Sequence, residues 1–335
     1  MKGLVVGGGS IGTRHSRNLR TLGVEQLALV EIQAERRISL GCELGMPVFE
    51  TLAEGLSWSP DFVVVATPSH LHMQPALEAV RHGCDVFVEK PLSHLAEGLS
   101  ELADLVERKN TVSLVGCNMR FHPGPARVKG LLDEQALGKI LFARIHVGSY
   151  LPGWRSGADY RQNYAAREQT GGGCILDCIH EIDLARWYLG DVQEVFCVAG
   201  HISSLEILTE DVAVLVCRHE QGPISEIHLD YVQRSYERGC QIAGEAGSIF
   251  WDFSGRQVRW YDAASERWTN FAQAEDWQPN QMYFDEMRHF LECVRTRRRS
   301  VLPIPEALAV MQIVFAAKAS ARQGRMIAMA KEVIA

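Results

Sequence analysis

The feature that most constrains the fold is a glycine-rich turn near the start of the chain, between an apolar run and a helical pattern. The segment "KGLVVGGGSIGTRHSRNLRTLG" passes from an expected strand at 4–6 into a helix, and it matches GxGxxG at Gly7, Gly9 and Gly12. Glycines in this pattern permit a tight turn, close approach of a pyrophosphate to the backbone, and close packing of helix on strand. We expect the dinucleotide-contacting residues here to be Gly7, Gly9, Ser10, Ile11 and Gly12.

Strand and helix patterns then alternate along the first 120 residues. The runs "QLALVE", "DFVVVATP" and "DVFVEKP" each precede a helical pattern, and "VSLVGCNMRF" closes the series. This order predicts a parallel, doubly wound sheet, in which ligands bind beyond the carboxyl ends of the strands. The polar and proline residues at those ends, which we assign to the cofactor site, are Thr67, Pro68, His70, His72, Glu89, Lys90 and Asn118.

The second strand ends in an acidic residue that bears on the choice of cofactor. Glu31 follows the glycines by about 20 residues, where a carboxylate binds the adenosine ribose hydroxyls. This position favours NAD. Arg36 and Arg37 lie just downstream and are able to bind a 2′-phosphate, so NADP is kept as the alternative.

The pattern changes after Phe121 to a series of strands. A helix is expected near 125–134 and a strand at "ILFARIHVGSY", followed by strands at about 193–202, 210–219, 223–234, 237–244, 247–253 and 256–261. Sequential strands with short turns predict one large, mostly antiparallel sheet. We therefore expect an α/β protein with a Rossmann domain at 1–120 and a substrate-binding and oligomerisation domain at 121–335, whose two C-terminal helices can pack back on the first domain.

An apolar, helix-like segment carries several ionisable groups. "GGGCILDCIHEIDLARW", residues 171–187, contains Asp177 and His180 among residues suited to burial. We expect the glycines to let the backbone approach the cofactor, and the helix to be anchored by its apolar residues while the two polar side chains face substrate. Cys174 and Cys178 share a helix face, but no second cluster completes a metal-ligand set, so no metal is expected.

The loop at 151–170 combines arginines with aromatic residues. Long ordered loops of this composition commonly contact ligands, and guanidinium groups suit a carboxylate or phosphate, which indicates an anionic substrate. Packing at a subunit interface is the alternative for this loop. The substrate-contacting residues that we predict beside Lys90, Asp177 and His180 are Arg120, Trp154, Arg155, Tyr160, Arg161 and Tyr164.

Composition excludes several classes of protein. The chain has 34 basic and 41 acidic residues and a net charge of −7, which makes nucleic acid an unsuitable partner. No apolar stretch was found with the roughly 18 to 20 residues of a membrane helix, and the N-terminus lacks a signal-peptide pattern. The nine cysteines are scattered without a CxxC pair. We therefore expect a cytoplasmic protein with reduced thiols and no membrane partner.

With "GGGSIG", "TPSHLH", "VFVEKP" and "GGGCILDCIHEIDLARW" in this order, the chain resembles the Gfo/Idh/MocA oxidoreductases over nearly its whole length. The resemblance implies an NAD(P)-dependent dehydrogenase of a sugar, sugar acid, nucleotide sugar or cyclitol, assembled as a homodimer or homotetramer. It also implies that Lys90 lies near the nicotinamide and the reacting hydroxyl, that His180 is the general acid/base, and that Asp177 accompanies them. Asp177 precedes His180 by three positions, whereas four is usual in the family.

Part of the sequence is similar to a narrower group within that family. The stretch from Trp154 to Asp183 resembles members associated with bacterial surface sugars and nonulosonic acids. Two other functions are weighed against a sugar dehydrogenase. A non-catalytic ligand sensor on the same fold has no need of both Lys90 and His180, and imine or biliverdin reductases do not need the "HEID" helix beside "EKP".

Overall fold

The computed structural model describes residues 1–154, 157 and 159–329. Among the described residues the chain divides into two compact units, one made of residues 1–118 and 279–311 and the other of 119–278 and 312–329. The first unit therefore ends two residues before the boundary expected after residue 120. It also includes a helix that follows the second unit's large sheet in the sequence, so it is not continuous along the chain.

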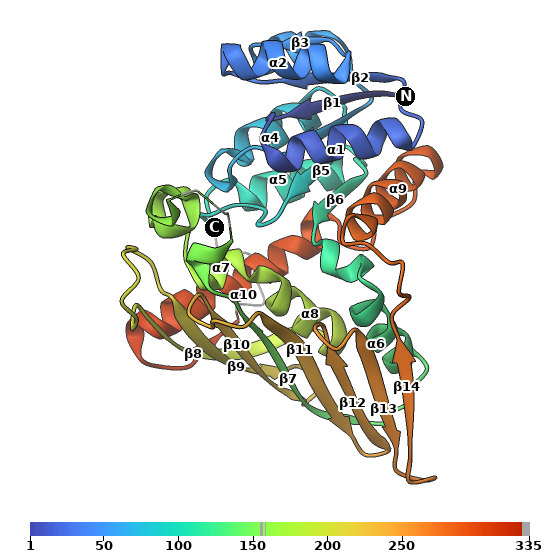
Figure 1. Ribbon diagram of the computed structural model, residues 1–335, viewed down its shortest axis with the longest axis vertical. Coiled ribbons are helices and arrows are strands. Elements are labelled where there is room, and N and C mark those ends of the chain that lie inside the picture. The colour runs from blue at the N-terminus through green and yellow to red at the C-terminus, as the bar shows by residue number, and fades with distance from the viewer. Residues whose placement is uncertain (155–156, 158, 330–335) are drawn as a thin grey trace. The chain divides into compact units, whose positions relative to one another are not determined.

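The first unit contains a six-stranded sheet in the order β3-β2-β1-β4-β5-β6, and every neighbouring pair is parallel. The doubly wound parallel sheet predicted from the alternation is confirmed (Figure 1). Its elements are β1 (Lys2–Val6), α1 (Ser10–Thr21), β2 (Gln26–Val30), α2 (Ala34–Leu44), β3 (Val48–Phe49), α3 (Leu52–Ser57), β4 (Phe62–Val65), α4 (Met73–Arg81), β5 (Asp85–Glu89), α5 (Leu99–Arg108), β6 (Ser113–Gly116) and α9 (Asn280–Thr296).

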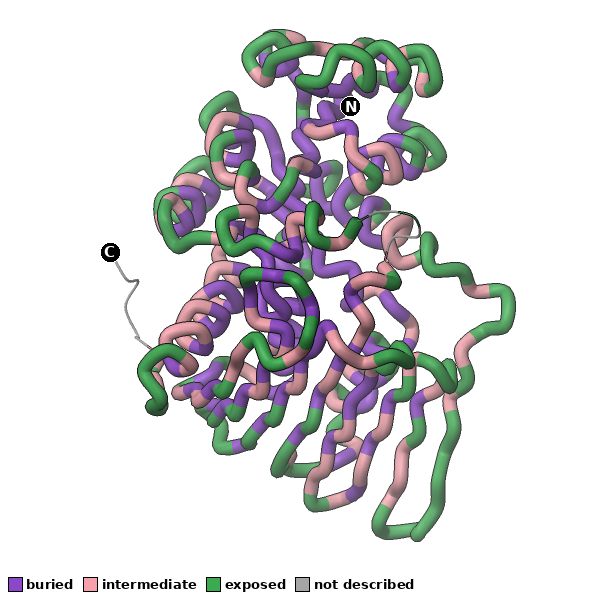
Figure 2. Tube along the Cα trace, turned by 60° about the vertical axis from the view of Figure 1, so that its left-hand side comes forward, coloured by how far each residue is buried: buried purple, intermediate pink, exposed green. Residues whose placement is uncertain are grey.

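The neighbouring strands β4 and β5 of this sheet are buried along their whole length. All four residues of β4, "FVVV", have no exposed surface, and the tube of Figure 2 is largely purple in the interior of this unit. Continuous apolar runs of this kind are typical of parallel sheets, because helices cover both faces. The helix α9 packs against α1, so the last part of the first unit's core comes from residues far along the chain.

The second unit contains a nine-stranded sheet in the order β14-β13-β12-β11-β7-β10-β9-β8-β15. The predicted mostly antiparallel sheet is confirmed, although β7 and β10 form a parallel pair within it. Its elements are α6 (Pro123–Asp133), β7 (Ile140–Gly148), α7 (Cys174–Asp177), α8 (Ile179–Leu189), β8 (Val192–Gly200), β9 (Val212–His219), β10 (Ile224–Asp230), β11 (Glu237–Gly244), β12 (Gly247–Asp252), β13 (Gln257–Asp262), β14 (Arg267–Ala272), α10 (Ile304–Gln323) and β15 (Ile327–Ala328).

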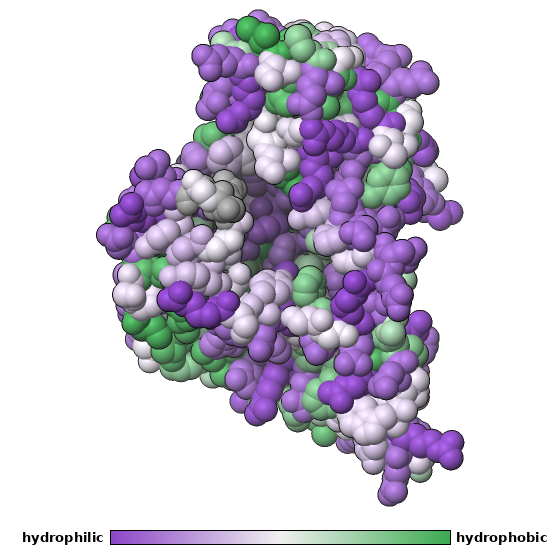
Figure 3. All heavy atoms as spheres, viewed as in Figure 1, coloured by the Kyte–Doolittle hydropathy of each residue, from purple (hydrophilic) through white to green (hydrophobic). Residues whose placement is uncertain are grey.

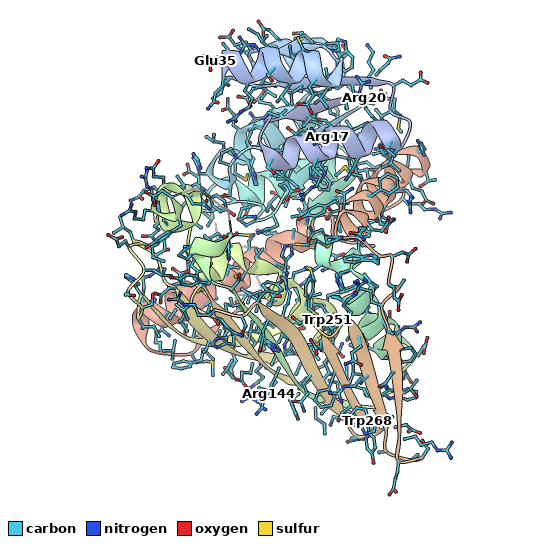
Figure 4. All side chains as sticks on the ribbon, viewed as in Figure 1. Arg17, Arg20, Glu35, Arg144, Trp251 and Trp268 are labelled. Carbon is cyan, nitrogen blue, oxygen red and sulfur yellow. The ribbon has the colours of Figure 1, made fainter. Side chains whose placement is uncertain are left out.

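Side chains alternate between the two faces of this sheet. Strand β9 alternates buried and more exposed residues, and Figure 2 shows the same alternation along the neighbouring strands. The helices α6 and α8 contact one face. Trp251 is 3% exposed and lies on that side, while Arg144 and Trp268 extend from the other, outer face (Figure 4). The period of two in each strand thus separates a core face from an outer face.

The longest helix, α10, contributes to both units, with residues 304–311 in the first and 312–323 in the second. By length and composition alone it is long and apolar enough to cross a membrane, contrary to the expectation that the chain has no such stretch. Its inward residues Val310, Val314 and Ala317 are at most 2% exposed within the protein. This helix has the pattern of a core helix.

Candidate functional site

The glycine turn between β1 and α1 is shaped for close packing. Gly7 has a φ of +103°, and a Cβ atom there would lie 2.7 Å from the carbonyl oxygen of Ala66. A Cβ atom at Gly12 would lie 1.9 Å from the carbonyl oxygen of Gly7, so these positions require glycine. At Gly9, in contrast, it would meet nothing within 4 Å. The helix begins at Ser10 with no side-chain cap and no acidic residue in its first turn, as an anion-binding N-terminus requires.

Glu31 lies at the carboxyl end of β2 and is 4% exposed. One carboxylate oxygen accepts a hydrogen bond from the backbone N–H of Gly8 at 3.0 Å, and the other accepts from Gln33 at 2.8 Å. A guanidinium nitrogen of Arg36 lies 3.6 Å away. The glycine turn and the acidic residue predicted to bind ribose are therefore joined directly within the first unit.

The residues of the turn after β4 that we assigned to the cofactor site differ in their exposure to solvent. Pro68 is exposed, Thr67 and His70 are half-buried, and His72 is 1% exposed. One ring nitrogen of His72 lies 2.8 Å from the carbonyl oxygen of Thr67, and the other lies 2.9 Å from that of Pro91. Both nitrogens of His72 are thus occupied by backbone groups of the protein.

The turn after β5 carries Glu89, Lys90 and Pro91. Glu89 is 8% exposed, and its carboxylate lies 2.6 Å from Nε2 of His15 and also accepts the backbone N–H of Lys90 at 3.2 Å. Lys90 itself is half-buried. Asn118, 6% exposed at the end of β6, hydrogen-bonds the phenol of Tyr283.

Three residues near this turn were missed by the sequence reasoning. His15 lies one helical turn after Gly12, and Tyr283 and Glu286 come from α9, near the opposite end of the chain. Burial raises the pKa of Tyr283, and the charge of Glu89 adds to this effect. Glu286 had a usable signal in the sequence, because it is a charged residue in the apolar stripe of an amphipathic helix.

The glycines at 171–173 have a structural role within the second unit. A Cβ atom at Gly172 would lie 2.4 Å from the carbonyl oxygen of Ala165, and one at Gly173 would lie 2.3 Å from the carboxylate of Glu210. Gly173 also has a φ of +103°. These contacts give Gly172 and Gly173 a structural role, and the approach to a cofactor remains a prediction. The single helix expected after them is divided into α7 and α8 at Cys178.

Asp177 and His180 lie on either side of this division, at the end of α7 and the start of α8. They are 6% and 8% exposed. The carboxylate of Asp177 accepts hydrogen bonds from the hydroxyl of Tyr164 at 2.9 Å and from that of Tyr231 at 3.3 Å. Burial raises the pKa of Tyr231 well above its ordinary value, and the charge of Asp177 contributes. Tyr231 was not predicted, because it follows β10 and reaches Asp177 only through the fold.

Two buried ion pairs hold α8 in place. Arg120 bonds both carboxylate oxygens of Asp183, at 2.9 and 2.7 Å, and Arg238 bonds both oxygens of Glu181, at 2.6 and 3.0 Å. The Arg120 side chain is 3% exposed and stacks over Trp187. The structure places Arg120, which the sequence assigned to substrate, in an ion pair with the helix that carries His180, and its contact with substrate remains a prediction.

The loop at 151–170 supplies the other predicted substrate residues. The indole N–H of Trp154 donates to Ser149 at 2.8 Å, and its ring packs edge-on against Tyr231. Arg161 pairs with Asp159 and Glu206, and the hydroxyl of Tyr160 accepts the backbone N–H of Glu206. Tyr164 contacts Asp177 as described above, and Arg155 lies outside the described residues. Trp154 and Tyr164 therefore belong to the surroundings of Asp177.

Metal ligation finds no support in the described part of the chain, where no three histidine, cysteine or acidic side chains gather as a metal site would require. What the described residues do form is a glycine turn and an acidic strand end suited to a dinucleotide, and a buried histidine three residues after a carboxylate that two tyrosine hydroxyls hold. With the two sheets, these features define a nicotinamide-dependent oxidoreductase whose Rossmann unit is joined to a unit with an open, mostly antiparallel sheet.

Comparison with known proteins identifies the family within that class. The profile of the oxidoreductase family with an NAD-binding Rossmann fold matches residues 1–117, and the profile of the GFO/IDH/MocA C-terminal domain matches residues 126–250. The chain belongs to the Gfo/Idh/MocA oxidoreductase family, as the sequence motifs predicted, and it is an NAD-binding oxidoreductase.

Individual relatives are distant in sequence but close in fold. The chain is 25% identical to scyllo-inositol 2-dehydrogenase (NAD(+)) of Bacillus subtilis over 96% of its length and 94% of that protein. It is 27% identical to 1,5-anhydro-D-fructose reductase of Ensifer adhaerens over 72% of its length and 71% of the relative. The crystal structure of a levoglucosan dehydrogenase with NADH superposes with a TM-score of 0.90 at 19% identity, covering 99% of this chain and all of the other.

Proposed function

We propose that this enzyme moves a hydride between NAD and a secondary hydroxyl or ketone of a sugar, sugar acid, nucleotide sugar or cyclitol in the cytoplasm. The observation that carries the proposal is His180, which is buried near the start of α8, three residues after a carboxylate that two tyrosine hydroxyls hold. Relatives named for an inositol and an anhydro-sugar support this class of substrate.

NAD fits the residues of the first unit. The turn at Gly7–Gly12 and the N-terminus of α1 suit its pyrophosphate, and Glu31 suits the adenosine ribose hydroxyls. Arg36, beside Glu31, is the residue able to admit the 2′-phosphate of NADP. The bound nicotinamide supplies the hydride acceptor or donor.

Residues of the protein transfer the proton of the substrate hydroxyl and stabilise the negative charge that develops on its oxygen. His180 accepts the proton of the hydroxyl when the alcohol is oxidised and returns it when the ketone is reduced, because an imidazole titrates near neutral pH. Lys90 donates a hydrogen bond to the same oxygen and stabilises the negative charge that develops there. Asp177, already held by Tyr164 and Tyr231, accepts a hydrogen bond from a further substrate hydroxyl or from His180.

The test begins with a screen of sugars, cyclitols, sugar acids and nucleotide sugars, read by NADH absorbance with NAD and with NADP. With the best substrate, His180→Ala and Lys90→Ala should each lose about 10²- to 10⁴-fold in kcat while binding NADH as the wild type does. His82→Ala, which changes an exposed histidine after α4, is the control. Near-normal kcat in either test variant would contradict the assigned role.

A non-catalytic sensor on the same fold is the second function to discriminate. A sensor would bind NADH and a sugar but would turn over none of the compounds, and the wild type and His180→Ala would then behave alike. The screen therefore separates the two functions before any variant is made.

We also propose that the enzyme is a homodimer or homotetramer in which a second copy covers the outer face of the nine-stranded sheet. The large hydrophobic residues exposed on that face include Phe142, Val198, Val216 and Ile224. In Figure 3 hydrophobic surface gathers at the lower left, over the region of β8 and α10. Exposed apolar surface of this kind commonly marks contacts between subunits.

A further inference from the structure

The turn that carries Lys90 is attached to its surroundings by two buried histidines from different elements. His15, with no exposed surface, comes from α1, and its Nε2 lies 2.6 Å from a carboxylate oxygen of Glu89. The other oxygen of Glu89 accepts the backbone N–H of Lys90 at 3.2 Å. A chain of contacts thus runs from the ring of His15, through one carboxylate, to the backbone of Lys90.

The second histidine, His72, contacts the residue that follows Lys90 in the sequence. The ring of His72 lies between the carbonyl oxygens of Thr67 and Pro91, at 2.8 and 2.9 Å. A neutral ring donates to one of these oxygens and a protonated ring to both. Burial lowers the pKa of His72, while the two carbonyl groups and the charge of Glu89 oppose that effect. In either state His72 links the turn after β4 to the residue that follows Lys90.

The surroundings of the His15–Glu89 pair make the contact difficult to replace. The ring of His15 packs against Phe87 and Tyr283, with ring centroids 5.1 and 6.3 Å away, and the guanidinium of Arg14 stacks over the ring of Tyr283. Glu286, fully buried on α9, interacts electrostatically with Glu89. In such a dry environment a hydrogen bond to a carboxylate is strong, and a carboxylate that loses its partner is costly.

We propose that His15 and His72 are positioning residues for Lys90, His15 acting through the carboxylate of Glu89 and His72 through the carbonyl oxygen of Pro91. Together they fix the backbone before and after Lys90, so that its ammonium group is presented to the reacting oxygen in one orientation. This inference rests on the proposed role of Lys90. Displacing a catalytic group by about 1 Å can cost 10²-fold in rate, which is the effect that such positioning prevents.

His15 lies on the helix whose N-terminus suits the cofactor. His15 lies five residues from Ser10, the first residue of α1, on the helix whose N-terminus suits the pyrophosphate. The same helix would therefore hold the pyrophosphate at its start and orient Lys90 through His15. Binding of the dinucleotide and orientation of the lysine are linked through the same element.

The experiment compares His15→Leu and His72→Leu, which remove the ring nitrogens, with His15→Gln, which keeps a donor near the carboxylate of Glu89. His82→Leu is the control, because that histidine is exposed. The full-length proteins are assayed with NAD and the best substrate of the screen, and NADH affinity is measured by nicotinamide fluorescence. Reductive methylation of Lys90, followed by mass spectrometry across a pH series, reports the environment of its amine without any substrate.

We expect the two leucine variants to lose about 10²-fold in kcat with little change in KM, and His15→Gln to recover most of the loss. The pH midpoint of Lys90 methylation should shift in the leucine variants and stay unchanged in His82→Leu. If His15→Leu does not bind NADH, Glu89→Gln replaces it as the test of the contact between His15 and Glu89. This substitution keeps the size of the side chain and removes the charge of the carboxylate.

The outcomes distinguish this inference from the proposed function. Normal turnover in Lys90→Ala would overturn the role of the lysine and the inference with it. Loss of turnover in Lys90→Ala, with normal kcat and an unchanged methylation midpoint in both leucine variants, would overturn the inference alone.

Discussion

At the scale of single residues, the first unit contains a buried acid, Glu286, to which the proposed mechanism gives no role. Neither carboxyl oxygen of Glu286 has a hydrogen-bond partner among the described residues. Burial raises the pKa of Glu286 well above its ordinary 4.5, and the charge of Glu89 raises it further. The folded protein therefore keeps a proton that the unfolded chain releases, so this stabilisation is present below the unfolded pKa and is lost as pH rises toward the folded pKa.

Replacing this acid by its neutral isostere tests that statement. Glu286→Gln should become more stable relative to the wild type as pH rises from 5 to 8, by up to about 1.4 kcal/mol per pH unit, because glutamine does not ionise. Urea unfolding across the pH series measures the difference. Glu292→Gln, on the exposed side of the same helix, is the control. Parallel stability curves for Glu286→Gln and the wild type would show that Glu286 is ionised in the folded protein.

Arg161, which the sequence suggested as a site for an anionic substrate, is already paired with acidic side chains in the structure. Its guanidinium pairs with Asp159 and Glu206, and the first of these raises the pKa of Arg161. Arg161→Ala should therefore change KM for an anionic substrate by less than about threefold, since exposed ion pairs contribute little net free energy. Steady-state kinetics with a sugar acid and a neutral sugar measures this. A large, selective rise in KM for the acid would instead make Arg161 the anion-binding residue.

At the scale of elements, α8 is buried on almost every side and still carries three ionisable residues in its first half. Nine of its eleven residues are buried, among them His180, Glu181 and Asp183. The Arg238–Glu181 and Arg120–Asp183 pairs satisfy two of these charges. A helix held by two bidentate ion pairs has little freedom to rotate about its axis, so the direction in which the side chain of His180 extends is fixed.

Breaking one of these pairs should destabilise the helix. Arg238→Met leaves Glu181 buried without its partner and should cost about 3–5 kcal/mol, whereas Arg288→Met, at the exposed pair with Asp285, should cost less than about 1 kcal/mol. Thermal unfolding monitored by circular dichroism compares the two. Adding Glu181→Met to Arg238→Met should restore part of the loss, because it removes the unpaired charge. Equal unfolding temperatures for Arg238→Met and the wild type would mean that the pair contributes nothing.

At the scale of the whole molecule, the outer face of the large sheet should decide the assembly state. Val198 is 63% exposed and Val216 is 38% exposed, and the register of β8 and β9 places both on that face. The double variant Val198→Asp/Val216→Asp should shift the protein toward monomers, because a charge buried at a subunit interface is costly. Light scattering after size-exclusion chromatography measures the mass. Ile38→Asp, at an exposed position on α2, is the control, and an unchanged mass in the double variant would exclude this face as the interface.

Much of the fold and part of the site followed from local patterns in the chain. The glycine turn, the acidic end of β2 and the alternation of strand and helix predict a parallel sheet, because each depends on neighbouring residues and on periodicities of 3.6 and 2. The motif that contains Lys90 was located in the same way, at a strand end marked by Pro91. The family also followed from the order of four short motifs.

The long-range contacts were decided by the tertiary structure alone. The parallel pairing of β7 with β10, the return of α9 to the first unit, and the partners of Arg120, His15 and Asp177 all join residues far apart in sequence. Local periodicity does not determine which buried charged residues pair with each other. Their pairing depends on how whole elements pack and on the free-energy cost of leaving a buried polar group without a partner. For this reason the sequence alone gave no sign that Arg120 pairs with Asp183 on the helix of His180, which only the folded protein shows.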